Sequence, residues 1–257
     1  MFRLVIVILS VLSLVRGDLS GLDDRVVNGR AGSIQEFPFM VSIQQNGRHF
    51  CGGSLLNAEW ILTAGHCILD IIRAGQVKTI KVRAGSSVYN TGGVVRNVQS
   101  AACHELYDPA NMIYDVAVLR VEGRYVESSV IKFIKLLTSP IPSGKPVVVS
   151  GWGQLSDRNT NLPMNIQATE MSYLNYKDCS PIHGRALHQS MICAIAPGKD
   201  ACRGDSGGPL TIPGTNVQVG VVSWGIQCAD AGLPGVYANV LDRQIVDFLQ
   251  RYVGKLA

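Results

Sequence analysis

The segment KDACRGDSGGPL, residues 199–210, places a serine between glycines and directly after an aspartate. Gly204, Gly207 and Gly208 allow backbone turns that a side chain would block, and they let another molecule approach the backbone closely. A buried strand would carry larger apolar side chains at these positions. The segment therefore indicates a functional site and not a core strand.

The order of candidate residues along the chain narrows the chemistry. Ser206 fits the G-x-S-x-G pattern, but in α/β-hydrolases the histidine follows the serine, and the last histidine here is His188. Subtilisin-like order needs an aspartate before the histidine, and none lies between Val26 and His66. The remaining order is His, Asp, Ser, with Asp115 as the aspartate.

The surroundings of the histidine and the aspartate leave two interpretations open. His66 follows an apolar run and stands beside Cys67, so a disulfide could hold its backbone. Asp115 opens the apolar run DVAVL, where a carboxylate driven towards burial needs a donor such as an imidazole N–H. Taken singly, His66 is a structural histidine and Asp115 a strand-end cap. Only the motifs taken together favour catalysis.

Short alternating or apolar runs, bounded by turn residues, recur along the chain. They are FMVSIQ (39–44), WILTA (60–64), TIKVRA (79–84), DVAVL (115–119), PVVVSGW (146–152) and VQVGVVSW (217–224). The pair Asn46-Gly47 favours a tight hairpin turn. Many short strands without helical periodicity between them predict antiparallel barrels or a sandwich. A C-terminal amphipathic helix is predicted from apolar residues at helical spacing, namely Ile245, Phe248, Leu249 and Tyr252.

Composition and the N-terminal segment limit the class of protein. The 257 residues carry 23 basic and 19 acidic side chains without a run of Lys or Arg, so nucleic acid is not an expected partner. Arg3, the apolar stretch from Leu4 to Leu14 and Gly17 together predict a secretory signal peptide over residues 1–17. A membrane anchor, the alternative, needs about twenty apolar residues.

The next segment, DLSGLDDR at residues 18–25, has two interpretations. One is a polar, disordered leader. The other is a pro-segment whose cleavage after Arg25 makes Val26 a new N-terminus. Position alone does not choose between them.

Seven cysteines in a secreted chain predict a disulfide framework with one thiol left over. The spacing is compatible with the pairs Cys51 with Cys67, Cys179 with Cys193 and Cys202 with Cys228. Cys103 is the odd residue, either a buried free thiol or an intermolecular bridge. A zinc site is not expected, because there is no C-x-x-C pair and HELYD at 104–108 lacks the second histidine of a metalloprotease helix.

Eight motifs in register carry a family resemblance. They are RVVNG, CGGSLL, TAGHC, YDVAVL, SGWG, GDSGGPL, VVSWG and PGVYANV, spread over about residues 26–255. In this pattern the chain resembles trypsin-like serine proteases of the chymotrypsin fold, and most closely the three-disulfide trypsins of invertebrates. The resemblance implies an all-β fold of two antiparallel six-stranded barrels with the active site between them. Within the peptidase domain, 26–257, the barrels are expected at 26–130 and at 131–257, the latter with the C-terminal helix.

The resemblance also implies roles for the catalytic residues. Ser206 is the nucleophile, His66 the general base and then acid, and Asp115 orients the histidine. Backbone N–H groups of Gly204 and Ser206 form the oxyanion hole. Ser223 matches the serine that supports the buried aspartate.

Activation follows from the same resemblance. Cleavage after Arg25 frees the α-amine of Val26, which inserts and pairs with Asp205, and this orders the oxyanion loop. The implied protein is therefore a zymogen with an activation pro-segment at residues 18–25.

Specificity residues are implied around a primary pocket with Asp200 at its base, which predicts cleavage after Arg or Lys. Ala201 stands where many trypsins carry serine, which by family analogy leans towards Arg. The resemblance places the open walls of this pocket at Gly225 and Gly235. It places the wall where the substrate backbone pairs at Trp224 and Gly225. Two departures, Gln227 at the pocket mouth and Arg203 at its rim, leave the substrate range open.

The expected protein is a secreted, extracellular monomer. It acts on protein or peptide substrates, binds proteinaceous protease inhibitors and needs an activating protease. No cofactor or metal is expected, since the loop at 86–93 lacks the carboxylates of the family's calcium site. A narrow-specificity processing or cascade protease is one alternative, supported by the two pocket departures. An inactive homologue that acts as a binding protein is another, although all three catalytic residues are retained.

Overall fold

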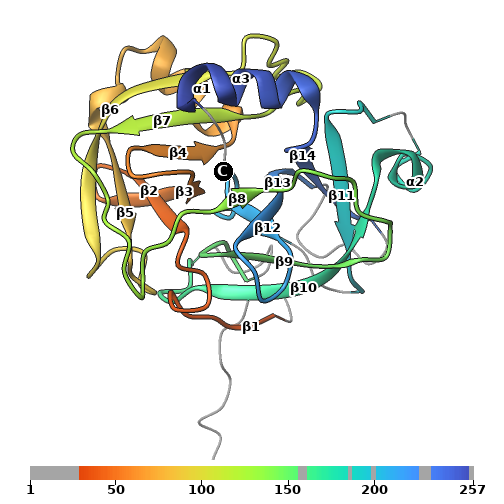
Figure 1. Cartoon of the computed structure of the whole chain (residues 1–257), viewed down its shortest axis with the longest axis horizontal. Helices are drawn as coiled ribbons and strands as arrows, with labels where there is room; N and C mark the ends of the chain where they lie inside the picture. The colour runs from red at the N-terminus through yellow and green to blue at the C-terminus, as the bar shows by residue number, and fades with distance from the viewer. Residues whose placement is uncertain (1–28, 156–160, 185–186, 198–200, 226–232, 255–257) are drawn as a thin grey trace, which may run out of the picture.

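The computed structural model describes residues 29–155, 161–184, 187–197, 201–225 and 233–254. Most of these residues lie in or between short antiparallel strands, which form two groups placed side by side in Figure 1. Each group closes into a six-stranded barrel, so the predicted all-β fold of two barrels is confirmed.

In the first barrel, neighbouring strands follow their order in the chain, except that two strands exchange places. Its strands in space are β2 (Met40–Gln45), β3 (Arg48–Leu55), β4 (Trp60–Thr63), β7 (Ala117–Val121), β6 (Val94–Cys103) and β5 (Ile80–Ala84), which pairs again with β2. The predicted hairpin turn joins β2 to β3. Asn46 and Gly47 both have positive φ angles, 53° and 76°, as a tight turn of this kind requires.

The second barrel closes because its first two strands in the chain pair with each other. Its strands in space are β9 (Pro146–Gly151), β10 (Gln167–Leu174), β11 (Met191–Ile195), β14 (Gly235–Asn239), β13 (Val217–Trp224) and β12 (Pro209–Thr211), which pairs again with β9. Two short strands lie outside this ring. β1 (Arg30–Ala31) pairs with β10, and β8 (Lys135–Leu136) runs parallel to β13.

All six predicted strand segments overlap observed strands, namely β2, β4, β5, β7, β9 and β13. The alternation that revealed them has a physical cause, because successive side chains of a strand point to opposite faces of the sheet. In β5, Ile80, Val82 and Ala84 are buried inside the first barrel, whereas Lys81 between them is exposed. Apolar alternation therefore identifies the inward face of each barrel.

Three α-helices and one 3₁₀ turn complete the described residues: α1 (Gly65–Arg73), η1 (Val77–Thr79), α2 (Tyr176–Cys179) and α3 (Arg243–Val253). α3 is the predicted C-terminal helix, and the side chain of Asp242 caps its N-terminus by accepting hydrogen bonds from the backbone N–H groups of residues 244 and 245. α1 and α2 were not predicted. No helix in the described ranges is both long and apolar enough to span a membrane.

Each end of the described chain packs on the barrel formed by the other half of the sequence. β1 is bonded to the second barrel, although the sequence assigns its residues to the first. α3 follows the second barrel but packs on the first, where Ile245, Phe248 and Leu249 are fully buried. Burying side chains of this size contributes about 2 kcal/mol each. The two terminal segments therefore connect the two barrels, and the division of the chain at residue 130 stays a prediction.

Candidate active site

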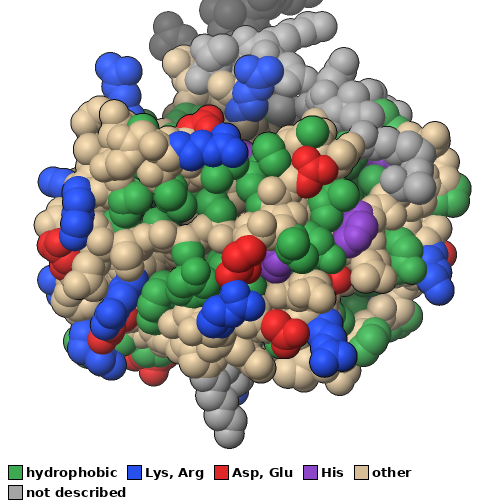
Figure 2. Space-filling model, turned by 90° about the horizontal axis from the view of Figure 1, so that it is seen from above, with side chains coloured by type: hydrophobic (Ala, Val, Ile, Leu, Met, Phe, Trp, Pro, Cys, Tyr) green, Lys and Arg blue, Asp and Glu red, His purple; other side chains and the backbone are tan. Residues whose placement is uncertain are grey.

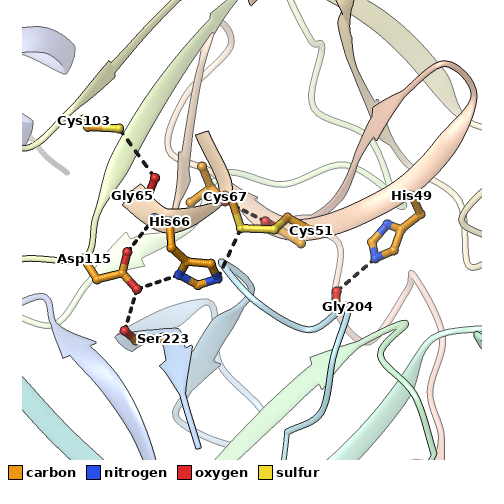
Figure 3. Close-up of a disulfide and its surroundings, with 11 residues drawn as sticks. His49, Cys51, Gly65, His66, Cys67, Cys103, Asp115, Gly204 and Ser223 are labelled. Carbon is orange, nitrogen blue, oxygen red and sulfur yellow. Dashed lines mark hydrogen bonds and ion pairs between the residues drawn. A yellow bond between two sulfur atoms is a disulfide. The ribbon is translucent and has the colours of Figure 1, made fainter. Parts of the chain in front are cut away.

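Asp115 is the centre of a hydrogen-bonded cluster of side chains (Figure 3). It is completely buried just before β7 and accepts three hydrogen bonds. Its Oδ1 accepts from the backbone N–H of His66 at 2.8 Å, and its Oδ2 accepts from Nδ1 of His66 at 2.7 Å and from Oγ of Ser223 at 2.5 Å. A buried carboxylate with three donors is well solvated by the protein, so Asp115 is a strong acceptor for the imidazole.

Local sequence explains why His66 faces this carboxylate. It is the second residue of α1, which begins directly after β4, and the disulfide between Cys67 and Cys51 fixes the first turn of the helix to β3. Gly65 allows close approach, because a Cβ atom there would make tight contacts, 3.1 Å from the Tyr107 ring and 3.2 Å from Oδ1 of Asp115. The histidine ring is therefore held by backbone, disulfide and carboxylate together.

Ser206 lies where the two barrels meet. Its carbonyl accepts a hydrogen bond from the N–H of Gly52 on β3 at 2.8 Å. Gly207, with a φ of 79°, packs so tightly against the end of β4 that a Cβ would lie 2.1 Å from Oγ1 of Thr63 and 3.0 Å from the backbone nitrogen of Ala64. The glycines of the opening motif thus let the serine segment dock beside the strand that leads to His66.

The structure brings the predicted catalytic residues together to different degrees. His66 and Asp115 are bonded, and the predicted support from Ser223 is present. The hydrogen bonds of the described residues include none between Oγ of Ser206 and Nε2 of His66. That nitrogen instead lies 3.7 Å from Sγ of Cys67, and the imidazole side chain is 26% exposed, so its reactive edge is open to a ligand.

Asp205 is a second buried carboxylate, directly before Ser206. It is only 2% exposed and accepts hydrogen bonds from the backbone N–H groups of Gly153 at 2.7 Å and Cys202 at 3.0 Å. Burial raises the pKa of Asp205 to about 6, because the two backbone donors only partly offset the loss of water. Among the described residues, no Lys, Arg or His side chain forms an ion pair with it.

The motif SGWG at 150–153 makes room for this carboxylate. A Cβ atom on Gly151 or on Gly153 would lie 2.1 Å or 2.2 Å from an oxygen of Asp205, closer than any real contact. Sequence reasoning recognised the motif as a family marker and missed this role. The spacing of two glycines around a buried Trp152 was the available signal.

The oxyanion segment is held by a histidine that sequence reasoning also missed. Nε2 of His49 donates a hydrogen bond to the carbonyl of Gly204 at 2.9 Å, and its Nδ1 accepts from Oγ of Ser42 at 2.8 Å. Burial lowers the pKa of His49 to about 4, so the ring is neutral near pH 7. Gly204 itself has a φ of 101°, a conformation that L side chains rarely adopt.

The predicted specificity residues are only partly visible. Asp200, Gln227, Arg25 and Val26 lie outside the described residues. Trp224 is half-buried at the end of β13, and the ring of His183 packs against it with centroids 5.3 Å apart. The other predicted pocket residues differ in exposure: Ala201 is half-buried, Arg203 and Gly225 are exposed, and Gly235 is buried in β14.

Two of the three predicted disulfides are confirmed, Cys51 with Cys67 and Cys179 with Cys193. The third cannot be followed, because Cys228 lies outside the described residues. Cys103 has no disulfide partner within the described chain and is half-buried, and its Sγ lies 3.6 Å from the carbonyl oxygen of Gly65. Burial, and then the charge of Asp115, raise the pKa of this thiol to about 12.

Two groups of sulfur and nitrogen atoms have metal-like spacing. They are Cys51 with His66 and Cys67, and Cys179 with His183 and Cys193. In each group the two sulfur atoms are bonded to each other, so they are not available as thiolate ligands. The spacing results from the disulfides and provides no zinc site.

Comparison with known proteins now gives the family. The family model described as Trypsin matches residues 26–248. The chain belongs to the trypsin family. It is 42% identical to "Trypsin delta" of Drosophila erecta over 229 residues, 88% of each chain. It is also 42% identical to "Trypsin alpha-4" of Lucilia cuprina over 227 residues, 87% of this chain and 86% of that one. This trypsin-family chain is a serine endopeptidase, as the sequence predicts.

Proposed function

We propose that this chain is a secreted serine endopeptidase, made as a zymogen, that hydrolyses peptide bonds after Arg or Lys through an acyl-enzyme. In this proposal Ser206 is the nucleophile, His66 the base and Asp115 the orienting group. The observation that carries it is the set of three hydrogen bonds from His66 and Ser223 to Asp115. A histidine needs this kind of support to remove a proton from a serine hydroxyl.

The proposed chemistry proceeds in two halves. Nε2 of His66 accepts the Ser206 proton while Oγ attacks the scissile carbonyl, and the resulting imidazolium donates that proton to the leaving amine. A water molecule then repeats the cycle and releases the new carboxylate. Asp115 keeps Nδ1 protonated and stabilises the imidazolium between the two transfers.

The backbone N–H groups of Gly204 and Ser206 are proposed to hold the oxyanion. Losing one such donor typically costs about 3 to 4 kcal/mol of barrier. The hydrogen bond from His49 to the carbonyl of Gly204 supports this role, because it fixes the orientation of the adjoining peptide. The conformation of Gly204, with a φ of 101°, serves the same purpose.

Activation is proposed to follow removal of the signal peptide after Gly17 and cleavage after Arg25. Asp205 supports this step, because a buried carboxylate whose pKa is raised to about 6 by burial is only partly stabilised by its two backbone donors. An ammonium group from Val26 would complete its environment. Breaking such a buried pair costs about 3 to 5 kcal/mol, which is enough to control the neighbouring loop.

Specificity for Arg or Lys rests on Asp200 and on the trypsins to which the chain is similar. A carboxylate at the base of a narrow pocket favours a cation, because an unpaired buried charge is costly. A narrower processing role remains the second proposal, supported by Arg203 and Gln227 at the pocket edge.

The proposal is tested on two secreted recombinant proteins, the full-length chain and a chain beginning at Val26. A serine-directed phosphonate should label Ser206 rapidly only in the chain that begins at Val26. A peptide library should then be cut after Arg and Lys. Labelling at equal rates in both proteins would contradict the zymogen, and absence of labelling in both would contradict the enzyme.

The library result also separates the alternatives. Cleavage after Arg or Lys with little preference at neighbouring positions supports a broad protease. Strong selection at several positions supports a narrow processing role. A matched Ser206→Ala chain is the control for hydrolysis by contaminating enzymes.

A further inference from the structure

A cavity of about 550 Å³ lies at the N-terminus of α3. It is lined by residues of α2 and α3, by the end of β10, and by Tyr114 next to Asp115. Its volume is within the range of small-molecule sites, about 300 to 1,000 Å³. The catalytic proposal uses none of its lining residues.

Three tyrosines dominate the lining, Tyr114, Tyr173 and Tyr176. Tyr173 belongs to the core of the second barrel and is only 5% exposed, yet its hydroxyl makes no hydrogen bond to any described residue. Buried tyrosine hydroxyls usually find a partner. The cavity therefore contains a tyrosine hydroxyl that reaches its surface and has no acceptor among the described residues.

The lining of the cavity holds one acid, Asp242, and one base, Arg243, so its formal charge is balanced. Asp242 is buried and its carboxylate caps α3, and Asp178 nearby accepts hydrogen bonds from Ser143 and Asn175. Arg243 projects into solvent and lies 3.8 Å from Asp247, while Lys177 lies over the Tyr176 ring. The acids at the cavity are thus held mainly by neutral hydrogen-bond donors. Figure 2, which views the face carrying α1 and α3, likewise shows acidic and basic side chains interspersed.

The rim of the cavity also carries hydrogen-bonding side chains. The side chains of Gln189 and Gln244 are exposed at the cavity and make no hydrogen bond to described residues. A carboxamide both donates and accepts, and a phenol O–H does the same. Tyrosine side chains and carboxamides in one lining match a ring that carries hydroxyl groups.

We propose that this cavity, here called the tyrosine cavity and defined by Tyr114, Tyr173, Tyr176, Gln189 and Gln244, binds an uncharged ring that bears several hydroxyl groups. Two sources share that chemistry, a pyranose sugar and a polyhydroxylated phenol. The ring packs on the tyrosines, and its hydroxyls accept the bond that Tyr173 cannot make within the protein. This binding does not depend on the proposed catalytic function.

Binding is tested by two-dimensional NMR on the Ser206→Ala chain, which avoids self-digestion during the titration. The neutral probes are methyl β-D-glucopyranoside and resorcinol, and the charged probe is tetramethylammonium. A neutral probe should shift the amides of Tyr114, Asn175, Gln189 and Gln244 in a saturable way at concentrations up to about 10 mM. Whichever neutral probe binds identifies the source.

Variants connect such binding to the tyrosine cavity. Tyr173→Phe removes only the hydroxyl without a protein partner, so the fold should be kept and affinity should fall about fivefold. Tyr176→Phe provides the same test if the first variant fails to fold. Tyr252→Phe, on the far end of α3, is the matched control and should bind as the parent does.

Three results would overturn the proposal. One is no saturable shift with either neutral probe. Another is equal affinity in the Tyr173→Phe and Tyr252→Phe variants. The third is tighter binding of tetramethylammonium than of the neutral probes, since three tyrosines can also form a cage for a cation.

Discussion

Asp115 and Asp205 are equally buried, at 0% and 2% exposure, but their surroundings differ in one respect. Asp115 receives two side-chain donors and one backbone donor, and one of these donors can become a cation when His66 is protonated. Among the described residues, Asp205 receives donors only from two backbone N–H groups. The first carboxylate has its complete set of partners within the described fold, whereas the second is suited to accept one more.

The comparison separates two uses of a buried acid. A fully bonded carboxylate orients a neighbouring group at every stage of a reaction. A carboxylate with an incomplete set of partners is destabilised until a cation pairs with it. If cleavage of a distant peptide bond supplies that cation, the order of the segment around the carboxylate depends on the cleavage. The following experiments change one of these two environments at a time.

The largest effect is expected for Asp115→Asn in the chain beginning at Val26. The amide preserves the shape but favours the wrong tautomer of His66, so kcat should fall by about four orders of magnitude. Steady-state hydrolysis of an Arg ester measures the loss, and circular dichroism checks that the fold is retained. A fall of less than tenfold would mean that Asp115 does not orient the histidine.

Asp205→Asn should have the next largest effect on the same chain. It removes the proposed partner of the Val26 ammonium, so kcat/KM should fall on the order of 10²-fold or more. In the full-length chain the substitution should leave the low basal rate unchanged. Equal losses in both chains would assign Asp205 a structural role unrelated to processing.

The pH dependence of stability distinguishes the two carboxylates without measuring activity. Between about pH 4 and pH 6, the folded full-length chain keeps on Asp205 a proton that the unfolded chain has lost. Its free energy of unfolding should therefore fall by about 3 kcal/mol as the pH rises through this window. The chain beginning at Val26 should not show this fall, because an ammonium partner lowers the pKa of Asp205.

His49 acts in the opposite direction and in both chains. Its pKa is lowered to about 4, so the unfolded state binds a proton between about pH 4 and pH 6.5 that the folded state does not, and stability rises with pH there. Because His49 contributes equally in both chains, its contribution cancels when the unfolding free energy of one chain is subtracted from that of the other. Urea unfolding of the Ser206→Ala versions of both chains provides two curves of unfolding free energy against pH. Parallel curves would rule out a new partner for Asp205 in the chain beginning at Val26.

Ser223→Ala should have a smaller effect than either carboxylate substitution. It removes one donor from Asp115 and leaves both bonds from His66, so kcat should fall by about tenfold with little change in KM. Ser223→Thr retains a hydroxyl and is the matched comparison. A loss confined to KM would place Ser223 in substrate binding instead of support for Asp115.

The smallest effect is expected at Cys103. Its thiol pKa is raised to about 12, so at pH 8 iodoacetamide should react at least about a hundredfold more slowly than with a free cysteine. Cys103→Ala should change kcat/KM by less than about fivefold, because only a weak contact to the carbonyl of Gly65 is lost. Rapid alkylation would show that the thiol is accessible and ionised.

The sequence predicted the parts of this site that depend on local pattern. The motifs around His66, Asp115 and Ser206 and the strand alternation were readable, because each is a property of neighbouring residues. The packing of Gly207 on Thr63, and of Gly151 on Asp205, joins segments far apart in the chain and has no local signature. The bond from His49 to Gly204 was missed for the same reason.

The helix α1 was missed for a different reason. Its nine residues begin immediately after a strand and inside a motif known for its histidine, although Ile68, Ile71 and Ile72 have helical spacing. The helix is amphipathic and short, so tertiary packing contributes more to its stability than residue propensity does. A search for helical spacing after every predicted strand would have found it.

The packing of α3 on the first barrel has a consequence for biosynthesis. The first barrel leaves the ribosome early, but the surface under Ile245, Phe248 and Leu249 stays uncovered until the last part of the chain is made. The bonds from α3 to that barrel, between His104 and Gln244 and between Arg251 and Glu105, also form last. The nascent protein therefore carries an exposed apolar surface until α3 has been made, and a chain truncated before α3 should be prone to aggregate.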